Sequence, residues 1–219
     1  MTRLAIFDCD GTLVDSGADI VAAMDRAFGD EGLPPPPPND TRRIVGLSLP
    51  QAIAVLAPDI DPARRARLAD GYRAAFHAMR AAGEVAEPLY DGIAEVVETL
   101  GRDGWRLAVA TGKSDRGLRL CLERHDLHAR FCSLQTADRH PSKPHPSMIE
   151  AALADTGIAP ARAAMIGDTS YDMAMAREAG VRAIGVAWGY HDPSELVASG
   201  AEAVARSPGD LLVILEGLR

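Results

Sequence analysis

The chain has 219 residues, of which 47% are hydrophobic and 25% are charged, a composition typical of a globular protein with one sizeable core. Its 23 basic and 31 acidic residues give a net charge of -8, which argues against nucleic acid or an anionic membrane as a partner. No apolar run approaches the ~18 residues of a membrane span, and no signal sequence precedes the first predicted strand, so we expect a cytoplasmic protein.

The first predicted element is an apolar strand at residues 4–7, which ends in two acidic residues. Asp8 and Asp10 are two positions apart, so in an extended chain both point to the same side. Two carboxylates this close repel each other unless a cation lies between them or one of them holds a proton. The pair, followed by Gly11 and Thr12, therefore marks a candidate site. An acidic turn without function is the simpler alternative for such a pair taken alone.

Residues 15–83 contain no convincing strand. Apolar residues at helical spacing predict one helix near residues 20–28 and a second over 64–79, and the proline run at 34–38 predicts a stiff connector between them. We expect an all-helical domain at 15–83, inserted into a larger domain formed by residues 1–14 and 84–219.

The rest of the chain alternates between predicted strands and helices. The strands are at residues 107–110, 163–166 and 183–186, with a weaker candidate at 131–134. The helices are at 93–100 after a possible cap at Asp91, at 148–153 and 173–179, each closed by a glycine, and at 211–218. This alternation predicts an α/β fold with a doubly wound parallel sheet, in which ligands bind at the carboxyl ends of the strands.

Two polar clusters directly follow predicted strands, and a third lies in a loop before the strand at 163–166. They are Thr111-Gly112-Lys113-Ser114, the loop Ser142-Lys143-Pro144-His145-Pro146, and Gly167-Asp168-Thr169-Ser170-Tyr171-Asp172. Parallel strands place these clusters at one edge of the sheet, together with Asp8 and Asp10. Carboxylate oxygens suit magnesium, and a lysine with a free backbone amide suits phosphate. Lys113 and Lys143 are the only lysines of the sequence, and both fall in these clusters.

Taken together, the clusters resemble the four motifs of the haloacid dehalogenase-like hydrolase superfamily, in order and over nearly the whole chain. The resemblance implies that Asp8 is the nucleophile and that Asp10 protonates the leaving oxygen and then activates water. It also implies that Mg²⁺ is held by Asp8, the Asp10 carbonyl and Asp168, with Asp172 ligating or supporting that shell. Phosphoryl transfer by a carboxylate nucleophile divides hydrolysis into two displacements, which needs positioning and charge neutralisation above all.

The remaining roles follow from the same resemblance. Thr111 and the Gly112 amide would hold the transferring oxygens, and Lys143, as a further catalytic residue, would neutralise both nucleophile and phosphoryl group. The helical insertion matches the small α-helical cap of the family, which closes over the site and contacts the leaving group. Arg43 is a candidate for binding substrate phosphate, and Arg42, Gly46 and Ser48 are further candidates for substrate contact.

Other readings differ in how well the residues support them. A nucleotide-binding P-loop fails because Leu107 stands where that motif needs a glycine. Asp10 disfavours dehalogenases, and Leu49 after Ser48 departs from the β-phosphoglucomutases. The strongest resemblance is to phosphoglycolate phosphatases, through residues 143–146, 167–169 and 185–190, although those relatives often carry asparagine at the position of Gly112.

We therefore expect a magnesium-dependent phosphatase that acts on a small phosphorylated metabolite. A sugar phosphomutase, a pyrophosphatase and, more remotely, a non-enzymatic binding module remain open. The sequence does not indicate the oligomeric state.

Overall fold

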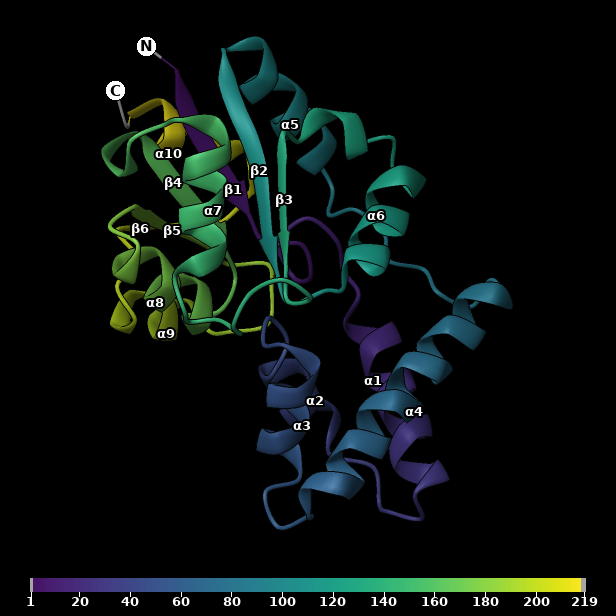
Figure 1. Cartoon of the computed structure of the whole chain (residues 1–219). Coiled ribbons are helices and arrows are strands. Elements are labelled where there is room, and N and C mark those ends of the chain that lie inside the picture. Colours follow the sequence, from purple (N-terminus) through teal and green to yellow (C-terminus); the bar gives the residue numbers. More distant parts are fainter. Residues whose placement is uncertain (1, 218–219) are drawn as a thin grey trace.

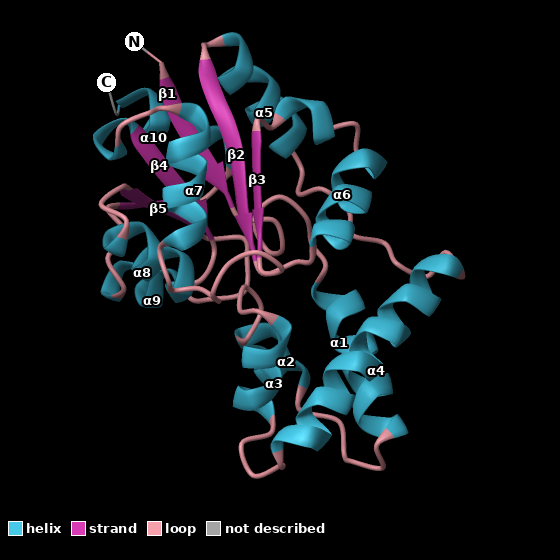
Figure 2. Ribbon diagram, in the orientation of Figure 1, coloured by secondary structure: helices cyan, strands magenta, loops and turns pink. Residues whose placement is uncertain are grey.

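The computed structural model describes residues 2–217, and its centre is a six-stranded parallel sheet in the order β3-β2-β1-β4-β5-β6 (Figures 1 and 2). The strands are short and mostly buried, as in sheets that helices cover on both faces. Their bounds are β1 (Arg3–Phe7), β2 (Trp105–Thr111), β3 (Ser133–Thr136), β4 (Ala163–Gly167), β5 (Arg182–Val186) and β6 (Ala203–Ala205).

Helices cover both faces of this sheet, and the alternation of side chains along β1 decides which residues meet them. Ala5 and Phe7 pack into an apolar cluster with α5 (Ile93–Arg102), α6 (Asp115–Arg124) and α10 (Pro208–Gly217). Leu4 and Ile6 pack on the opposite face with α7 (Ser147–Thr156), α8 (Ser170–Glu178) and α9 (Pro193–Ala198). Two 3-10 turns, η1 (His128–Arg130) and η2 (Pro160–Arg162), complete the connections. The expected doubly wound parallel sheet is confirmed.

Four helices between β1 and β2 form a separate group, which we call the cap helices. They are α1 (Gly17–Asp30), α2 (Pro38–Arg43), α3 (Leu49–Leu56) and α4 (Pro62–Ala81), and they lie below the carboxyl ends of the strands in Figure 1. Met24, Ile53 and Leu68 belong to an apolar cluster drawn from this group alone. Because this cluster is independent of the sheet, we propose that residues 15–83 form a cap domain and that residues 1–14 and 84–219 form the core domain.

The structure corrects several sequence-based boundaries. β3 begins at Ser133, two residues later than expected, because Phe131 follows η1 and packs against Phe7 with ring centroids 6.3 Å apart. Asp91 does not cap α5, because the residue at the N-cap is Gly92 in a left-handed conformation with φ of 88°. Helix α8 begins at Ser170, earlier than expected. The end of the helix expected at 211–218 falls partly outside the described residues, since Leu218 is not among them.

Some elements were not expected at all: α2, α3, α6, α9 and β6. Helix α6 illustrates the reason, because it buries only Leu118, Cys121 and Leu122 and its other positions are mostly charged or polar. Three buried residues in a helix of ten give a weak helical pattern, which tertiary packing then completes. Among the described helices, none is both long and apolar enough to cross a membrane.

The central position of β1 gives a test of this packing. Ile6 is fully buried, so Ile6→Ala is expected to lower the free energy of unfolding by about 2–5 kcal/mol, measured by urea denaturation. Val213→Ala on α10 is the control, because Val213 is 69% exposed and its truncation should change stability by less than about 0.5 kcal/mol. Equal effects of the two substitutions would contradict this arrangement.

Candidate active site

The ends of three adjacent strands bring the predicted site residues together. Asp8 follows β1, Thr111 is the last residue of β2, and Asp168 follows β4. Strand β1 pairs with both β2 and β4, so these residues lie at neighbouring positions on one edge of the sheet. Lys143 reaches the same edge from the loop between β3 and α7.

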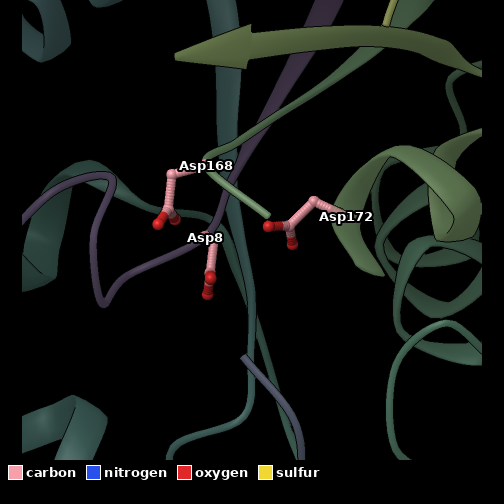
Figure 3. A group of neighbouring side chains, drawn as sticks. All are labelled: Asp8, Asp168 and Asp172. Atoms are coloured by element: carbon pink, nitrogen blue, oxygen red, sulfur yellow. The ribbon is translucent and has the colours of Figure 1, made fainter. Parts of the chain in front are cut away.

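Three fully buried carboxylates form the centre of the site (Figure 3). Asp8, Asp168 and Asp172 each offer an oxygen atom, and these atoms lie within 4.8 Å of one another. Asp172 comes from the first turn of α8, where it forms a capping box with Thr169. The capping box thereby fixes the third carboxylate against the ends of β1 and β4.

Lys143 is the ammonium group of this cluster and is 1% exposed. Its Nζ lies 2.9 Å from Asp8 Oδ1 and 2.7 Å from Asp172 Oδ1. The other oxygen of Asp172 accepts hydrogen bonds from the Thr169 backbone N–H at 3.1 Å and the Thr169 hydroxyl at 2.7 Å. Both oxygens of Asp172 are therefore engaged, and this carboxylate orients Lys143.

Asp168 is also fixed by neighbouring groups. Its two oxygens accept hydrogen bonds from the Thr12 hydroxyl and from the Tyr190 backbone N–H, each at 2.9 Å. Gly11 has a φ of +81°, and a Cβ at that position would overlap the Asp168 carboxylate. The Asp-Gly-Thr segment after β1 thus makes room for Asp168 with its glycine and holds it with its threonine.

The electrostatics of the cluster show a deficit of positive charge. Burial raises the pKa of Asp8 to about 7, with Lys143 acting in the opposite direction and the charges of Asp172 and Asp10 raising it further. Burial, with the charges of Asp172 and Asp8, also raises the pKa of Asp168 well above its ordinary range. For Lys143, the two carboxylates outweigh burial and raise the pKa of the ammonium. Three carboxylates thus share one ammonium group.

A divalent cation fits this donor set. Asp8 Oδ1 accepts hydrogen bonds from Lys143 and from the Cys9 backbone N–H at 2.6 Å, whereas Asp8 Oδ2 is buried without a hydrogen-bond partner among residues 2–217. A buried oxygen without a partner is costly unless something else satisfies it. Hard oxygen ligands of this kind are those that Mg²⁺ prefers, and Asp8 and Asp168 are placed to supply them.

Asp10 is held apart from the carboxylate cluster by a different lysine. Asp10 Oδ1 lies 2.8 Å from Lys113 Nζ and also accepts a hydrogen bond from the Ser16 hydroxyl. Unlike Asp8, the Asp10 residue lines a cleft of about 730 Å³ between the cap helices and the core. The structure therefore gives the two aspartates different surroundings: Asp8 faces Lys143 and the carboxylates, and Asp10 faces Lys113 and the cleft.

The core side of the cleft includes Gly112, and the cap packs directly on it. A Cβ at Gly112 would lie 2.5 Å from the Leu47 carbonyl oxygen and 2.7 Å from that of Gly46. The Ser48 backbone N–H donates to the Ser142 hydroxyl at 2.8 Å, beside Lys143 in the chain. Gly112 thus permits an approach of the cap that a side chain would block. Gly46 and Ser48, two of the candidates for substrate contact, line the cleft.

Arg43 lies elsewhere, which does not agree with its expected contact with substrate phosphate. Its guanidinium group makes two hydrogen bonds of 3.0 Å to Glu195 on α9, and its carbonyl accepts one of 3.0 Å from His191 Nε2. It lines a second cavity of about 570 Å³ beside the proline run. The residue connects the cap to the core from the side, because Glu195 holds its charge outside the cleft. Arg42 is paired with Asn39 at 3.3 Å.

Two residues of the site were not identified from the sequence. Ser16 binds Asp10, and Glu87, in the segment after α4, is fully buried and binds Lys113. Nothing in the linear pattern around Glu87 distinguishes it from an exposed acidic loop residue. The scarcity of lysine marks Lys113 as a candidate, but it does not predict that Glu87 pairs with it.

Comparison with known proteins agrees with this geometry. The family model of the haloacid dehalogenase-like hydrolases matches residues 5–186. A protein named "Probable phosphatase IndB" from Dickeya dadantii is 36% identical over 93% of this chain and 89% of its own length. The phosphoglycolate phosphatase of Caulobacter vibrioides is 36% identical over 92% of this chain and 85% of its own length.

A solved structure gives the same result for the fold. A hydrolase from Pseudomonas syringae superposes with a TM-score of 0.86 at 28% identity, and the match covers 98% of each chain. The family model extends from β1 to β5 and thus includes Asp8 and Asp10, the three polar clusters and the cap helices. The chain belongs to the haloacid dehalogenase-like hydrolase family.

Proposed function

We propose that this phosphatase hydrolyses a small phosphomonoester of the phosphoglycolate type, that it requires Mg²⁺, and that the phosphoryl group passes through Asp8. One observation carries the proposal: Asp8 has a buried oxygen with no hydrogen-bond partner among the described residues, within a cluster that is short of positive charge, while Asp10 faces the cleft beside it. A nucleophile and a separate proton donor are the two groups that such a hydrolysis needs.

In the first step, an oxygen of the Asp8 carboxylate attacks phosphorus and the bond from phosphorus to the leaving oxygen breaks. Asp10 gives its proton to that oxygen. Lys143 neutralises charge on Asp8 and on the phosphoryl group, and the Thr111 hydroxyl and the Gly112 amide hold the transferring oxygens. The cap excludes bulk water during this step.

In the second step, Asp10 takes a proton from a water molecule, which attacks phosphorus, releases phosphate and restores Asp8. Bound Mg²⁺, held by Asp8, Asp168 and the Asp10 carbonyl, would reduce the repulsion between the Asp8 carboxylate and the anionic substrate. Asp172 supports this site by orienting Lys143, whose ammonium lies 2.7 Å from Asp172 Oδ1.

The substrate class is supported by the named relatives and by the cluster of motifs, and a substrate panel tests it. We expect kcat/KM for 2-phosphoglycolate to exceed that for hexose phosphates, nucleoside monophosphates and pyrophosphate by about two orders of magnitude, or ~3 kcal/mol. Generic aryl phosphates serve as the reference for activity without selectivity. A comparable preference for a hexose phosphate or for pyrophosphate would overturn the phosphoglycolate assignment.

Asp8→Asn tests the nucleophile. The substitution should reduce turnover to background in a phosphate-release assay, because the amide cannot form the acyl phosphate. The fold should remain, since the change removes one of three crowded carboxylates and preserves shape. Asp15→Asn is the matched control, because Asp15 is exposed and lies in the same loop. Substantial activity in Asp8→Asn, with Asp15→Asn unchanged, would refute this role.

Metal dependence is tested by chelation and by Asp168→Asn. Removal of divalent cations should abolish phosphate release, and Mg²⁺ should restore it. Asp168→Asn is expected to raise the half-saturating Mg²⁺ concentration by about tenfold or more, as losses around metal sites do. Asp103→Asn at the exposed end of α5 is the control. Full activity in the presence of chelator, or an unchanged Mg²⁺ requirement in Asp168→Asn, would contradict the proposed site.

A further inference from the structure

Glu87 is a buried acidic residue in the segment that leads from the cap helix α4 back to the core. It is 0% exposed and has a φ of +36°, which is rare for a residue other than glycine. Its backbone N–H donates to Asp19 Oδ2 of α1 at 3.0 Å, and its carbonyl accepts a hydrogen bond of 2.8 Å from His125 Nε2 of the core. Both domains therefore fix the backbone that carries this carboxylate.

The Glu87 side chain lies between two cations. Oε1 is 2.7 Å from Lys113 Nζ, and Oε2 is 2.6 Å from the Arg80 guanidinium of α4. Lys113 Nζ in turn lies 2.8 Å from Asp10 Oδ1. The four groups form a row of alternating charge, Asp10-Lys113-Glu87-Arg80, that runs from the proposed proton donor to the cap.

The row explains how the Lys113 ammonium is accommodated in a buried position. The Lys113 side chain is 9% exposed, so its ammonium depends on the two carboxylates for the interactions that water would otherwise supply. Although burial acts to raise the pKa of Glu87, the charges of Lys113 and Arg80 lower it overall, which keeps the carboxylate ionised. Lys113 is thus held from two sides, by Asp10 in the cleft and by Glu87 behind it.

We propose that Glu87 is a positioning residue for Asp10. It holds the Lys113 ammonium in place, and that ammonium in turn directs the Asp10 carboxyl group to the leaving oxygen. The inference rests on the proposed function, in which Asp10 protonates that oxygen. Without the negative charge of Glu87, Lys113 keeps Asp10 as its one carboxylate partner in the row and draws it away from the substrate. Arg80 lines the cleft from the cap side, so the same row relates the position of the cap to that of Asp10.

Leaving groups that differ in their need for a proton distinguish this role from simple structural support. An alkyl phosphate such as 2-phosphoglycolate requires protonation of its leaving oxygen, whereas p-nitrophenyl phosphate releases a stable anion. Glu87→Gln is expected to lower kcat/KM for 2-phosphoglycolate by about tenfold more than kcat/KM for p-nitrophenyl phosphate. This loss is a part of the ~10²-fold or greater contribution that a general acid makes to the rate. The measured quantity is the ratio of the two kcat/KM values.

Glu84→Gln is the matched control. Glu84 lies three residues earlier in the same segment, and its carboxylate pairs with Arg26 at the surface, where both side chains are 49% exposed. This variant should leave the ratio unchanged. An equal loss for both substrates in Glu87→Gln, or no loss, would overturn the proposal. Hydrolysis of neither substrate by the unsubstituted protein with Mg²⁺ would instead refute the proposed function.

A double-mutant cycle with Lys113→Gln tests the route through the lysine. If Glu87 acts through Lys113, Glu87→Gln should change the ratio by less than about twofold once Lys113 is already glutamine. The double variant removes both members of the buried Glu87–Lys113 pair, so neither is left buried and charged by the loss of the other. The comparison with Lys113→Gln therefore remains informative even if Glu87→Gln alone does not fold. An undiminished effect of Glu87→Gln in the Lys113→Gln background would contradict the proposal.

Discussion

The Lys143 ammonium lies 2.9 Å from Asp8 and 2.7 Å from Asp172, inside a cluster that also contains the Asp168 carboxylate. If all groups are ionised, three negative charges face one positive charge without access to water, and a divalent cation balances the two that remain. The site therefore depends on this neutralisation, because burial and the neighbouring carboxylates disfavour the charged forms of Asp8 and Asp168 and raise the pKa of both. The parallel sheet, the capping box of α8 and the Lys143 loop all serve to hold these charges together.

The same principle separates the functions of the two aspartates after β1. Asp8 and Asp10 emerge from one strand end, but each is paired with a different lysine: Lys143 for Asp8 and Lys113 for Asp10. These are the only lysines of the sequence. Arginine provides the other basic side chains, so each lysine supplies a compact ammonium group where two carboxylates converge. Glu87 completes the second of these arrangements and extends it toward the cap.

The sequence predicts the positions of the main strands, because an apolar run is a local property of the chain. It also predicts that the residues at the strand ends meet, because parallel strands end at the same edge of a sheet. It was not sufficient for Arg43, whose side chain is drawn to Glu195, a residue 152 positions away. It also did not reveal Glu87, because the burial of a loop carboxylate depends on how the cap folds back on the core. β3 begins two residues later than the apolar pattern predicts, because Phe131 is apolar but follows a 3-10 turn. Long-range charge pairing and turn geometry thus account for the differences.

The account depends most directly on covalent transfer of the phosphoryl group to Asp8. Rapid mixing of the enzyme with Mg²⁺ and substrate, followed by acid quench and peptide mass spectrometry, measures this transfer. The account predicts a phosphoryl group on the peptide that contains Asp8 during the first turnover, located on Asp8 itself and lost once the substrate is consumed. Release of phosphate at full rate with no phosphoryl group on that peptide at any time point would contradict it.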